Sequence, residues 1–553
     1  MECGKARWEV NHSCEISPFE FNNKLIDLAK DQKKSTHSLL NAGRGNPNWI
    51  AATPREAFFA LGQFAVHESR RVWNEQDLAG QPRREGIAAR FAVYFHNSER
   101  VPGVKMLKDI VDYGITIHKF DADDWIHELV DGIIGDNYPM PDRMLVYIEQ
   151  IVHDFLLQEI CNNNSSCGRF DLFAVEGATA AMCYIFDSLV ANYLLAPRDK
   201  IAVMVPIFPP YVEIPQLARY QFDVVEIQAK GIDEQGKHTW QYPGSEINKL
   251  ADPAIKALFL VNPSNPPSVA IQPESIKQLI AIVKNHNPNL MIISDDVYGT
   301  FVDRYDSLIA NLPFNVIGVY SFSKYFGVTG WRLGVIAVQQ DNVFDKLLKQ
   351  LPEEQVDLCK KRYASLSPHM QELCFIDRLV ADSRQVALNH TAGLSTPQQV
   401  QMALFSAFAL LDRENKYKQL TKDICHRRIR LLYDGLGLPQ PNLPYGADYY
   451  TQFDLEEWSN HCCGKDFTKY LQQHYEPVDV LYRLAKNSSI VLLSGGGFHG
   501  PTWSIRVSLA NLDDGAYAQI GHELRKVLEE YVIEWQESEA KHSTLQHQEY
   551  PVL

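Results

Sequence analysis

The sequence predicts an α/β protein with two parts: a large domain with a mostly parallel sheet flanked by helices, and a smaller α/β domain. Three observations support this prediction. At 553 residues, the chain is longer than one ordinary domain. Between about residues 145 and 340, short apolar runs alternate with helical stretches, which is typical of parallel strands covered by helices on both faces. A second α/β pattern begins near residue 375.

The elements follow one another in a definite order. The first 130 residues predict several helices, broken by glycine and proline at 43–48 and 102–103. Ligands of parallel sheets bind at the carboxyl ends of the strands, so the residues after each apolar run are the candidate site residues. The runs that predict strands are Phe170–Val175, Ile201–Val205, Ala257–Val261, Leu290–Ser294, Val316–Tyr320 and Leu333–Val338.

We expect three segments. Residues 1–130 form an N-terminal helical arm and part of the small domain, residues 131–375 form the large ligand-binding domain, and residues 376–553 form the C-terminal small domain.

Composition excludes several classes of function. The formal net charge of -15 disfavours nucleic acid and anionic membranes as partners. We expect no signal peptide and no transmembrane helix, because no apolar stretch is long enough, and we therefore expect a cytoplasmic protein. The ten cysteines form no C-x-x-C pair, and the adjacent Cys462 and Cys463 are poorly spaced as metal ligands, so we expect reduced thiols and no metal.

The most specific motif is SFSKYFGVTGWRLG at 321–334, which follows an apolar run directly. A lysine at a strand end can bond to an aldehyde cofactor, and an arginine fork suits a phosphate. A lysine and an arginine alone are usually exposed loop residues. The full spacing, however, resembles the pyridoxal-phosphate lysine signature of class I aminotransferases, which have the type I aminotransferase fold. The resemblance implies that Lys324 carries pyridoxal 5'-phosphate and that Ser321, Ser323 and Arg332 bind the cofactor.

A second phosphate-binding turn is expected at FAVEGATAAM, residues 173–182. A strand, a Gly-Ala-Thr turn and a helix direct backbone N–H groups and a hydroxyl toward an anion. Glycine at such a turn is also common for steric reasons. In position, Ala178 and Thr179 are similar to the phosphate cup of the family.

Two further strand ends are similar to the parts of the family that hold the cofactor ring. Phe208, in MVPIFPPY, has the position of the aromatic residue that stacks on the ring. The segment FLVNPSNPPS resembles the family's N-P-x-N-P box, in which the second asparagine, here Asn265, contacts the ring oxygen. The family usually continues with Thr-Gly, whereas this chain has Pro267 and Ser268.

The run LMIISDDVYGTF, residues 290–301, resembles the family's D-x-x-Y pattern and selects Asp295 and Tyr298. The resemblance implies that Asp295 pairs with the pyridine nitrogen and that Tyr298 donates to the ring oxygen. We expect the neighbouring Asp296 to be a solvated or capping residue.

Substrate contacts are expected near both ends of the chain. WSIRVSLANL, residues 503–512, resembles the strand that carries the family's substrate arginine, so Arg506 would bind an α-carboxylate in a bidentate pair. Gly45 has the position of the family's substrate-side glycine turn. Tyr138 is similar to the tyrosine that reaches the phosphate of a neighbouring subunit, which would make the active site complete only in an oligomer.

The length of the chain and the segments NAGRGNPNW (41–49), VNPSNPPSV (261–269) and LNHTAGLSTPQQVQMALF (388–405) resemble the aspartate 4-decarboxylases within this family. This resemblance implies removal of the β-carboxylate of L-aspartate to give L-alanine and carbon dioxide, with side aminotransferase activity. It also implies a homo-oligomer built from dimers, a dodecamer in this subgroup. Arg44 is the candidate contact for the β-carboxylate, either as a selector of dicarboxylates or as a group that orients the carboxylate; it could instead be a packing or interface residue.

Three alternatives stay open. A plain aspartate aminotransferase would need the same cofactor residues. A non-catalytic regulator would keep the fold to sense a ligand, but the chain is acidic and shows no basic DNA-binding module. An oxidoreductase would depend on the glycine run 495–497, which does not open a helix as a dinucleotide-binding motif must.

Overall fold

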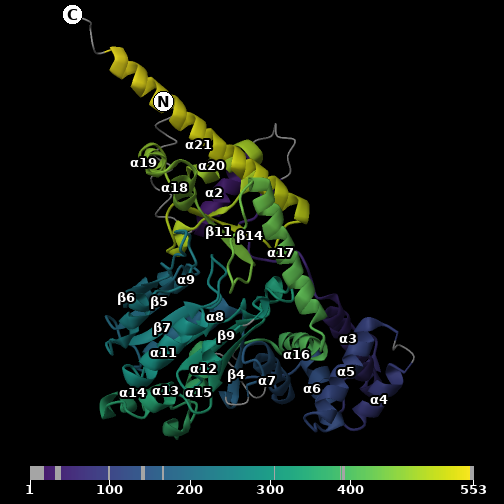
Figure 1. Cartoon of the computed structure of the whole chain (residues 1–553). Coiled ribbons are helices and arrows are strands. Elements are labelled where there is room, and N and C mark those ends of the chain that lie inside the picture. The colour runs from purple at the N-terminus through teal and green to yellow at the C-terminus, as the bar shows by residue number, and fades with distance from the viewer. Residues whose placement is uncertain are drawn as a thin grey trace, which may run out of the picture.

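The computed structural model describes residues 18–31, 39–96, 100–138, 143–164, 167–303, 305–386, 388 and 393–548. Its buried apolar side chains form two main clusters. The larger cluster surrounds a seven-stranded sheet, and the smaller surrounds a three-stranded sheet together with segments from both ends of the chain. In Figure 1 the smaller body lies at the top of the view, above the large sheet.

The large sheet has the strand order β4-β10-β9-β8-β7-β5-β6. Neighbouring strands are parallel except at β10, which is antiparallel to both β4 and β9. The carboxyl ends of β7, β8 and β9 therefore meet at one edge, where ligands of such sheets bind. The strands are β4 (Phe170–Val175), β5 (Lys200–Val205), β6 (Asp223–Gln228), β7 (Ile255–Val261), β8 (Met291–Asp295), β9 (Val316–Ser321) and β10 (Gly334–Gln339).

Helices cover this sheet through apolar faces at helical spacing. In α11, for example, Ile276, Leu279, Ile282 and Val283 are buried, and Pro273 starts the helix at a position where its missing N–H is harmless. The helices of this part are α7 (Val146–Glu159), α8 (Ala178–Ala191), α9 (Pro210–Glu213), α10 (Gly244–Ile247), α11 (Pro273–Asn285), α12 (Leu308–Asn311), α13 (Val343–Leu348), α14 (Glu353–Tyr363), α15 (Phe375–Ser383) and α16 (Thr396–Leu411).

Four helices from the first part of the chain form a group beside the large sheet. Their buried side chains belong to the larger cluster, and α3 and α6 contact α16 (Figure 1). A short hairpin, β2 (Asn74–Glu75) and β3 (Leu78–Ala79), follows the first of them. The helices are α3 (Ala52–Val72), α4 (Ile87–Tyr94), α5 (Pro102–Thr116) and α6 (Ala122–Ile134).

The smaller body is built on the sheet β11-β14-β13, with a two-stranded parallel pair, β1 and β12, beside it. The register pairs Gln452 with Arg506, so Tyr450 and Arg506 are diagonal neighbours on one face. The strands are β1 (Leu40–Asn41), β11 (Tyr450–Asp454), β12 (Ile490–Val491), β13 (Leu493–Ser494) and β14 (Ser504–Ser508). The helices are α2 (Pro18–Asp31), α17 (Lys416–Leu436), α18 (Leu455–Cys463), α19 (Lys465–His474), α20 (Asp479–Ser488) and α21 (Asp514–Gln548).

The predicted fold class is confirmed, and each of the six predicted apolar runs overlaps a strand of the large sheet. The sequence pattern missed β6, because this edge strand is only partly buried and its two charged residues, Asp223 and Glu226, interrupt the apolar run. The division of the chain near residues 130 and 375 stays a prediction. Within the described residues, no helix is long and apolar enough to cross a membrane.

Candidate active site

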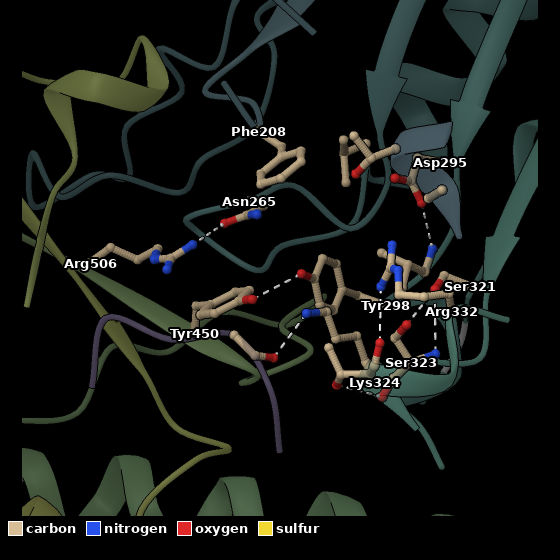
Figure 2. A pocket seen from close by; sticks show the side chains of 16 residues that line it. Phe208, Asn265, Asp295, Tyr298, Ser321, Ser323, Lys324, Arg332, Tyr450 and Arg506 are labelled. Atoms are coloured by element: carbon tan, nitrogen blue, oxygen red, sulfur yellow. Dashed lines mark hydrogen bonds between the residues drawn. The ribbon is translucent and has the colours of Figure 1, made fainter. Parts of the chain in front are cut away.

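A cavity of about 220 Å³ lies at the carboxyl edge of the large sheet, against the three-stranded sheet of the smaller body. Its lining includes Val261 at the end of β7, Asp295 at the end of β8 and Ser321 at the end of β9. Figure 2 shows that Arg506 and Tyr450 extend into the cavity from the opposite side, which the smaller body forms. The cavity is lined by every predicted site residue except Arg44 and Tyr138.

Lys324 lies in the turn after β9 and reaches the middle of the cavity (Figure 2). Its Nζ donates to the backbone oxygen of Gly45 at 2.9 Å. Aromatic neighbours fix the turn: the Phe322 ring stacks on Phe155 with centroids 5.4 Å apart, and Phe326 packs on Phe405 at 5.1 Å. Because these rings are anchored in the core, the lysine amine is directed into the cavity.

Arg332 lies across the start of α8. Its guanidinium donates to the backbone oxygens of Thr329 at 3.0 Å and Glu176 at 3.2 Å, which leaves further N–H groups for a ligand. A Cβ built on Gly177, whose φ is 86°, would lie 2.5 Å from an Arg332 nitrogen, so only glycine admits the arginine here. Arg332 itself has a φ of 55°, a conformation that costs about 1 to 2 kcal/mol and is typical of functional sites.

Anion-binding groups gather around this arginine. Ala178 and Thr179 are the first residues of α8, whose N-terminus carries partial positive charge and backbone N–H groups without helical partners. The hydroxyl oxygens of Ser321 and Ser323 lie 3.0 Å apart beside them. Hydroxyls, helix N-terminus and guanidinium together suit a phosphate group.

Asp295 is buried at the end of β8 and lines the cavity. Its carboxylate accepts hydrogen bonds from the Tyr211 hydroxyl at 2.6 Å and from the Val297 N–H at 3.2 Å. Burial raises the pKa of Asp295 to about 6, although both hydrogen bonds oppose the increase. A buried carboxylate of this kind favours a cationic partner, such as a protonated ring nitrogen.

The expectation for Asp296 is wrong. This residue is neither solvated nor a cap, because it is only 1% exposed and its Oδ1 accepts from the hydroxyls of Ser294 at 2.7 Å and Tyr305 at 2.6 Å. Burial raises the pKa of Asp296 to about 7. Since consecutive side chains after a strand point in opposite directions, Asp295 faces the cavity and Asp296 faces the core.

Phe208, Asn265 and Tyr298 complete the wall around the middle of the cavity (Figure 2). Tyr298 is buried, and its hydroxyl lies 3.0 Å from the hydroxyl of Tyr450. Burial among other tyrosines raises the pKa of Tyr298 well above its usual value, so this hydroxyl stays protonated and can donate a hydrogen bond.

Arg506 lies in the interior at 2% exposure. It donates to Asn265 Oδ1 at 3.2 Å and to the backbone oxygen of Gly43 at 2.6 Å, and its guanidinium lies 4.4 Å from the centre of the Tyr450 ring. Burial lowers the pKa of Arg506, and its Nε has no hydrogen-bond partner among the described residues. A buried cation with an unused donor fits a carboxylate ligand.

Two predicted residues lie outside the cavity lining. Arg44, beside Gly45, is exposed, and Tyr138 is 71% exposed. The prediction for Tyr138 concerns a neighbouring subunit, and the prediction for Arg44 concerns a bound substrate, so both stay predictions.

Sequence reasoning missed several residues of the site. Tyr450, Val261, Val297 and Thr329 line the cavity, and Tyr211 holds Asp295 from behind. Tyr211 lies three positions after Phe208, so the same strand end carried a usable signal. Nothing in the local pattern of Tyr450 separates it from an ordinary strand tyrosine.

In the part of the chain that the structure describes, no group of three or more histidine, cysteine or acidic side chains could hold a metal ion. The eight described cysteines are free thiols.

The fold and this lysine-centred cavity define a class of protein. Residues 147–521 match the family model "Aminotransferase class I and II", and the chain belongs to that family, whose members depend on pyridoxal phosphate. The chain is 47% identical, over 93% of its length and 96% of the relative's, to the bifunctional aspartate aminotransferase and L-aspartate beta-decarboxylase of a Pseudomonas species. It is 38% identical to the aspartate aminotransferase of Sulfolobus acidocaldarius over 33% of this chain and 44% of the relative.

Solved structures agree on the fold. A double mutant of Thermus thermophilus aspartate aminotransferase superposes with a TM-score of 0.56 at 15% identity, covering 92% of this chain and 96% of the other. An aromatic aminotransferase from Pyrococcus horikoshii gives 0.54 at 17% identity, covering 91% and 99%.

Proposed function

We propose that this chain is a pyridoxal-phosphate-dependent aspartate 4-decarboxylase that converts L-aspartate to L-alanine and carbon dioxide and has side aminotransferase activity. The observation that carries this proposal is the 47% identity, over nearly the whole length of both chains, to a protein named for both activities. The alternative is an aspartate aminotransferase without significant decarboxylation, which would use the same cavity.

The side chains fit pyridoxal phosphate. Arg332, Ser321, Ser323, Thr179 and the start of α8 would hold the phosphate, with Ala178 contributing its backbone. Phe208 would lie against the ring, Asp295 would pair with the ring nitrogen, and Asn265 and Tyr298 would donate to the ring oxygen. When bound through Lys324, the cofactor supplies an aldehyde and an electron sink.

The chain's own residues then perform three tasks. Arg506 binds the α-carboxylate of aspartate and so orients the amino acid, while Gly45 leaves room beside Lys324. The Lys324 amine, once released from the cofactor, takes the proton from the α-carbon as a general base and returns it as a general acid. Asp295 stays ionised and stabilises positive charge on the ring nitrogen.

Decarboxylation and transamination share these residues, so water access decides between them. Water that enters the cavity would favour release of the oxo acid, whereas side chains that exclude water would favour loss of the β-carboxylate. Phe208, Val261 and Val297 line the cavity with apolar surface, which would hinder water.

The deciding experiment omits any oxo-acid acceptor. The purified protein is incubated with pyridoxal phosphate and L-aspartate, and alanine and carbon dioxide are measured over time. We expect many turnovers of alanine per active site. One half-turnover to oxaloacetate that stalls until 2-oxoglutarate is added would overturn the decarboxylase and leave the aminotransferase.

Arg506→Lys is expected to lower kcat/KM for aspartate by about 10²-fold to 10³-fold. Lysine keeps the charge but loses the planar fork, and it leaves the oxygens of Asn265 and Gly43 without their present donors. Steady-state kinetics should show the loss mainly in KM. Arg378→Lys is the matched control, since Arg378 is also buried but donates to Asn192 away from the cavity. If the control raised KM for aspartate as much, the assignment of Arg506 would be wrong.

Assembly, localisation and two contacts belong to this proposal as well. We propose a cytoplasmic homo-oligomer built from dimers, a dodecamer as in the resembling subgroup, with Tyr138 reaching a neighbouring subunit's phosphate. Sedimentation of the loaded protein tests the subunit number.

Arg44 would contact the β-carboxylate; an Arg44→Ala variant with unchanged alanine production and unchanged affinity for aspartate would end that assignment.

A further inference from the structure

The proposed reaction consumes one proton for each carbon dioxide released, because a hydrogen replaces the carboxylate on the β-carbon. We propose that Tyr450 is the catalytic acid that supplies this proton, an inference that rests on the proposed decarboxylase function. The bond between the β-carbon and the carboxylate breaks, carbon dioxide leaves, and the electron pair stays with the carbon. The O–H bond of Tyr450 then breaks and a C–H bond forms at the β-carbon, and the tyrosine regains a proton from water that enters the cavity when alanine leaves.

The position of the Tyr450 hydroxyl supports this role. A Cβ built on Gly45 would lie 2.4 Å from the Tyr450 oxygen and 3.1 Å from Lys324 Nζ, so both groups border the same small space. Figure 2 shows the tyrosine between Arg506 and Lys324. An amino acid with its carboxylate on Arg506 and its α-carbon beside Lys324 has its β-carbon one bond further, within reach of that hydroxyl.

The other groups along the cavity are less suitable donors. The guanidinium groups of Arg332 and Arg506 do not release protons. Lys324 already serves the α-carbon, and Asp295, which accepts from Tyr211, would pair with the cofactor's ring nitrogen. Tyr298 would be held by the cofactor's ring oxygen. Among the described lining residues, Tyr450 is therefore the titratable group to which the proposed reaction assigns no other role.

Its neighbours hold the Tyr450 side chain in position. The Arg506 guanidinium lies 4.4 Å from the centre of the Tyr450 ring, in a cation–π contact. The Tyr298 hydroxyl lies 3.0 Å from the Tyr450 hydroxyl. While Tyr298 donates its own proton to the ring oxygen it can only accept from Tyr450, so this contact fixes the position of the Tyr450 oxygen.

The test is Tyr450→Phe in the pyridoxal-phosphate-loaded protein, which removes the hydroxyl and keeps the ring on Arg506. We expect alanine formation from L-aspartate to fall by about 10²-fold, the usual contribution of a general acid. Exchange of the α-deuterium of [2-²H]aspartate with solvent should change less than about threefold, as should the affinity for succinate measured by calorimetry, because Lys324 and Arg506 are intact. Tyr433→Phe is the control for loss of a buried hydroxyl, since Tyr433 contacts Thr451 away from the cavity; it should leave each of the three readouts unchanged.

The outcomes separate this inference from the function on which it rests. Alanine formation within threefold of wild type, or equal losses of alanine formation and α-exchange, would each overturn the assignment of Tyr450 as the acid. If Tyr450→Phe does not fold, Tyr450→His retains an acidic N–H and should form alanine faster than Tyr450→Leu; equal rates would overturn the assignment too. A wild-type protein that exchanges the α-hydrogen but makes no alanine would instead contradict the proposed function.

Discussion

Replacing Lys324 with alanine should reduce alanine formation from L-aspartate by about 10⁴-fold or more. The variant loses both the amine that bonds to the cofactor and the base that moves the α-proton, and groups that act in one step rarely compensate for each other. Borohydride reduction followed by mass spectrometry of the loaded protein should attach the cofactor to the peptide containing residue 324 in wild type and to no peptide in the variant.

The structure offers a matched control for this change. Lys346 is half-buried, donates to Asn289 and is not part of the cavity lining, so Lys346→Ala removes a lysine without touching the cavity. Its activity and its borohydride product should equal those of wild type. Borohydride attachment at a lysine other than 324 in wild type would contradict the proposed role of Lys324.

The sequence predicted the large sheet well, because its central strands are buried on both faces and therefore form continuous apolar runs. Edge strand β6 was missed, because the charged residues Asp223 and Glu226 interrupt its apolar run. Neither the antiparallel direction of β10 nor the joining of residues 18–31 and 39–42 to the C-terminal core follows from apolar runs. Both depend on contacts between segments far apart in the chain.

The candidate site shows the same division. Residues at a strand end or in the turn that follows it, such as Asp295 and Lys324, could be found because the fold brings strand ends together. Tyr450 could not, because its place in the site depends on Tyr298, a partner distant in sequence. The prediction that Asp296 is solvated or a cap was wrong, because its side chain is buried against Tyr305 and Ser294, and the turn sequence alone does not reveal those contacts.

Asp295→Asn is expected to lower kcat/KM by about 10³-fold, equivalent to about 4 kcal/mol of lost stabilisation for a buried ion pair. An amide cannot balance a positive charge on the ring nitrogen, so the cofactor accepts electrons less readily. Asp296→Asn is the matched control, because this adjacent buried carboxyl faces Ser294 and Tyr305 instead of the cavity. Steady-state kinetics should show a loss below about tenfold for the control, and equal losses would contradict the assignment of Asp295.

The same substitution should have the opposite effect on the stability of the cofactor-free protein at neutral pH. Because burial raises the pKa of Asp295 from 3.8 to about 6, its protonated form is favoured in the fold. This proton stabilises the folded state by up to about 3 kcal/mol. The stabilisation is complete below about pH 4 and is lost as the pH rises through about 6. The amide that replaces the carboxyl does not titrate, so the free energy of unfolding of Asp295→Asn relative to wild type should increase between about pH 4.5 and pH 7.5. Denaturation at both pH values measures this difference. A difference that stays constant with pH would mean that the carboxyl of Asp295 is already ionised at low pH, paired with a cation even before the cofactor binds.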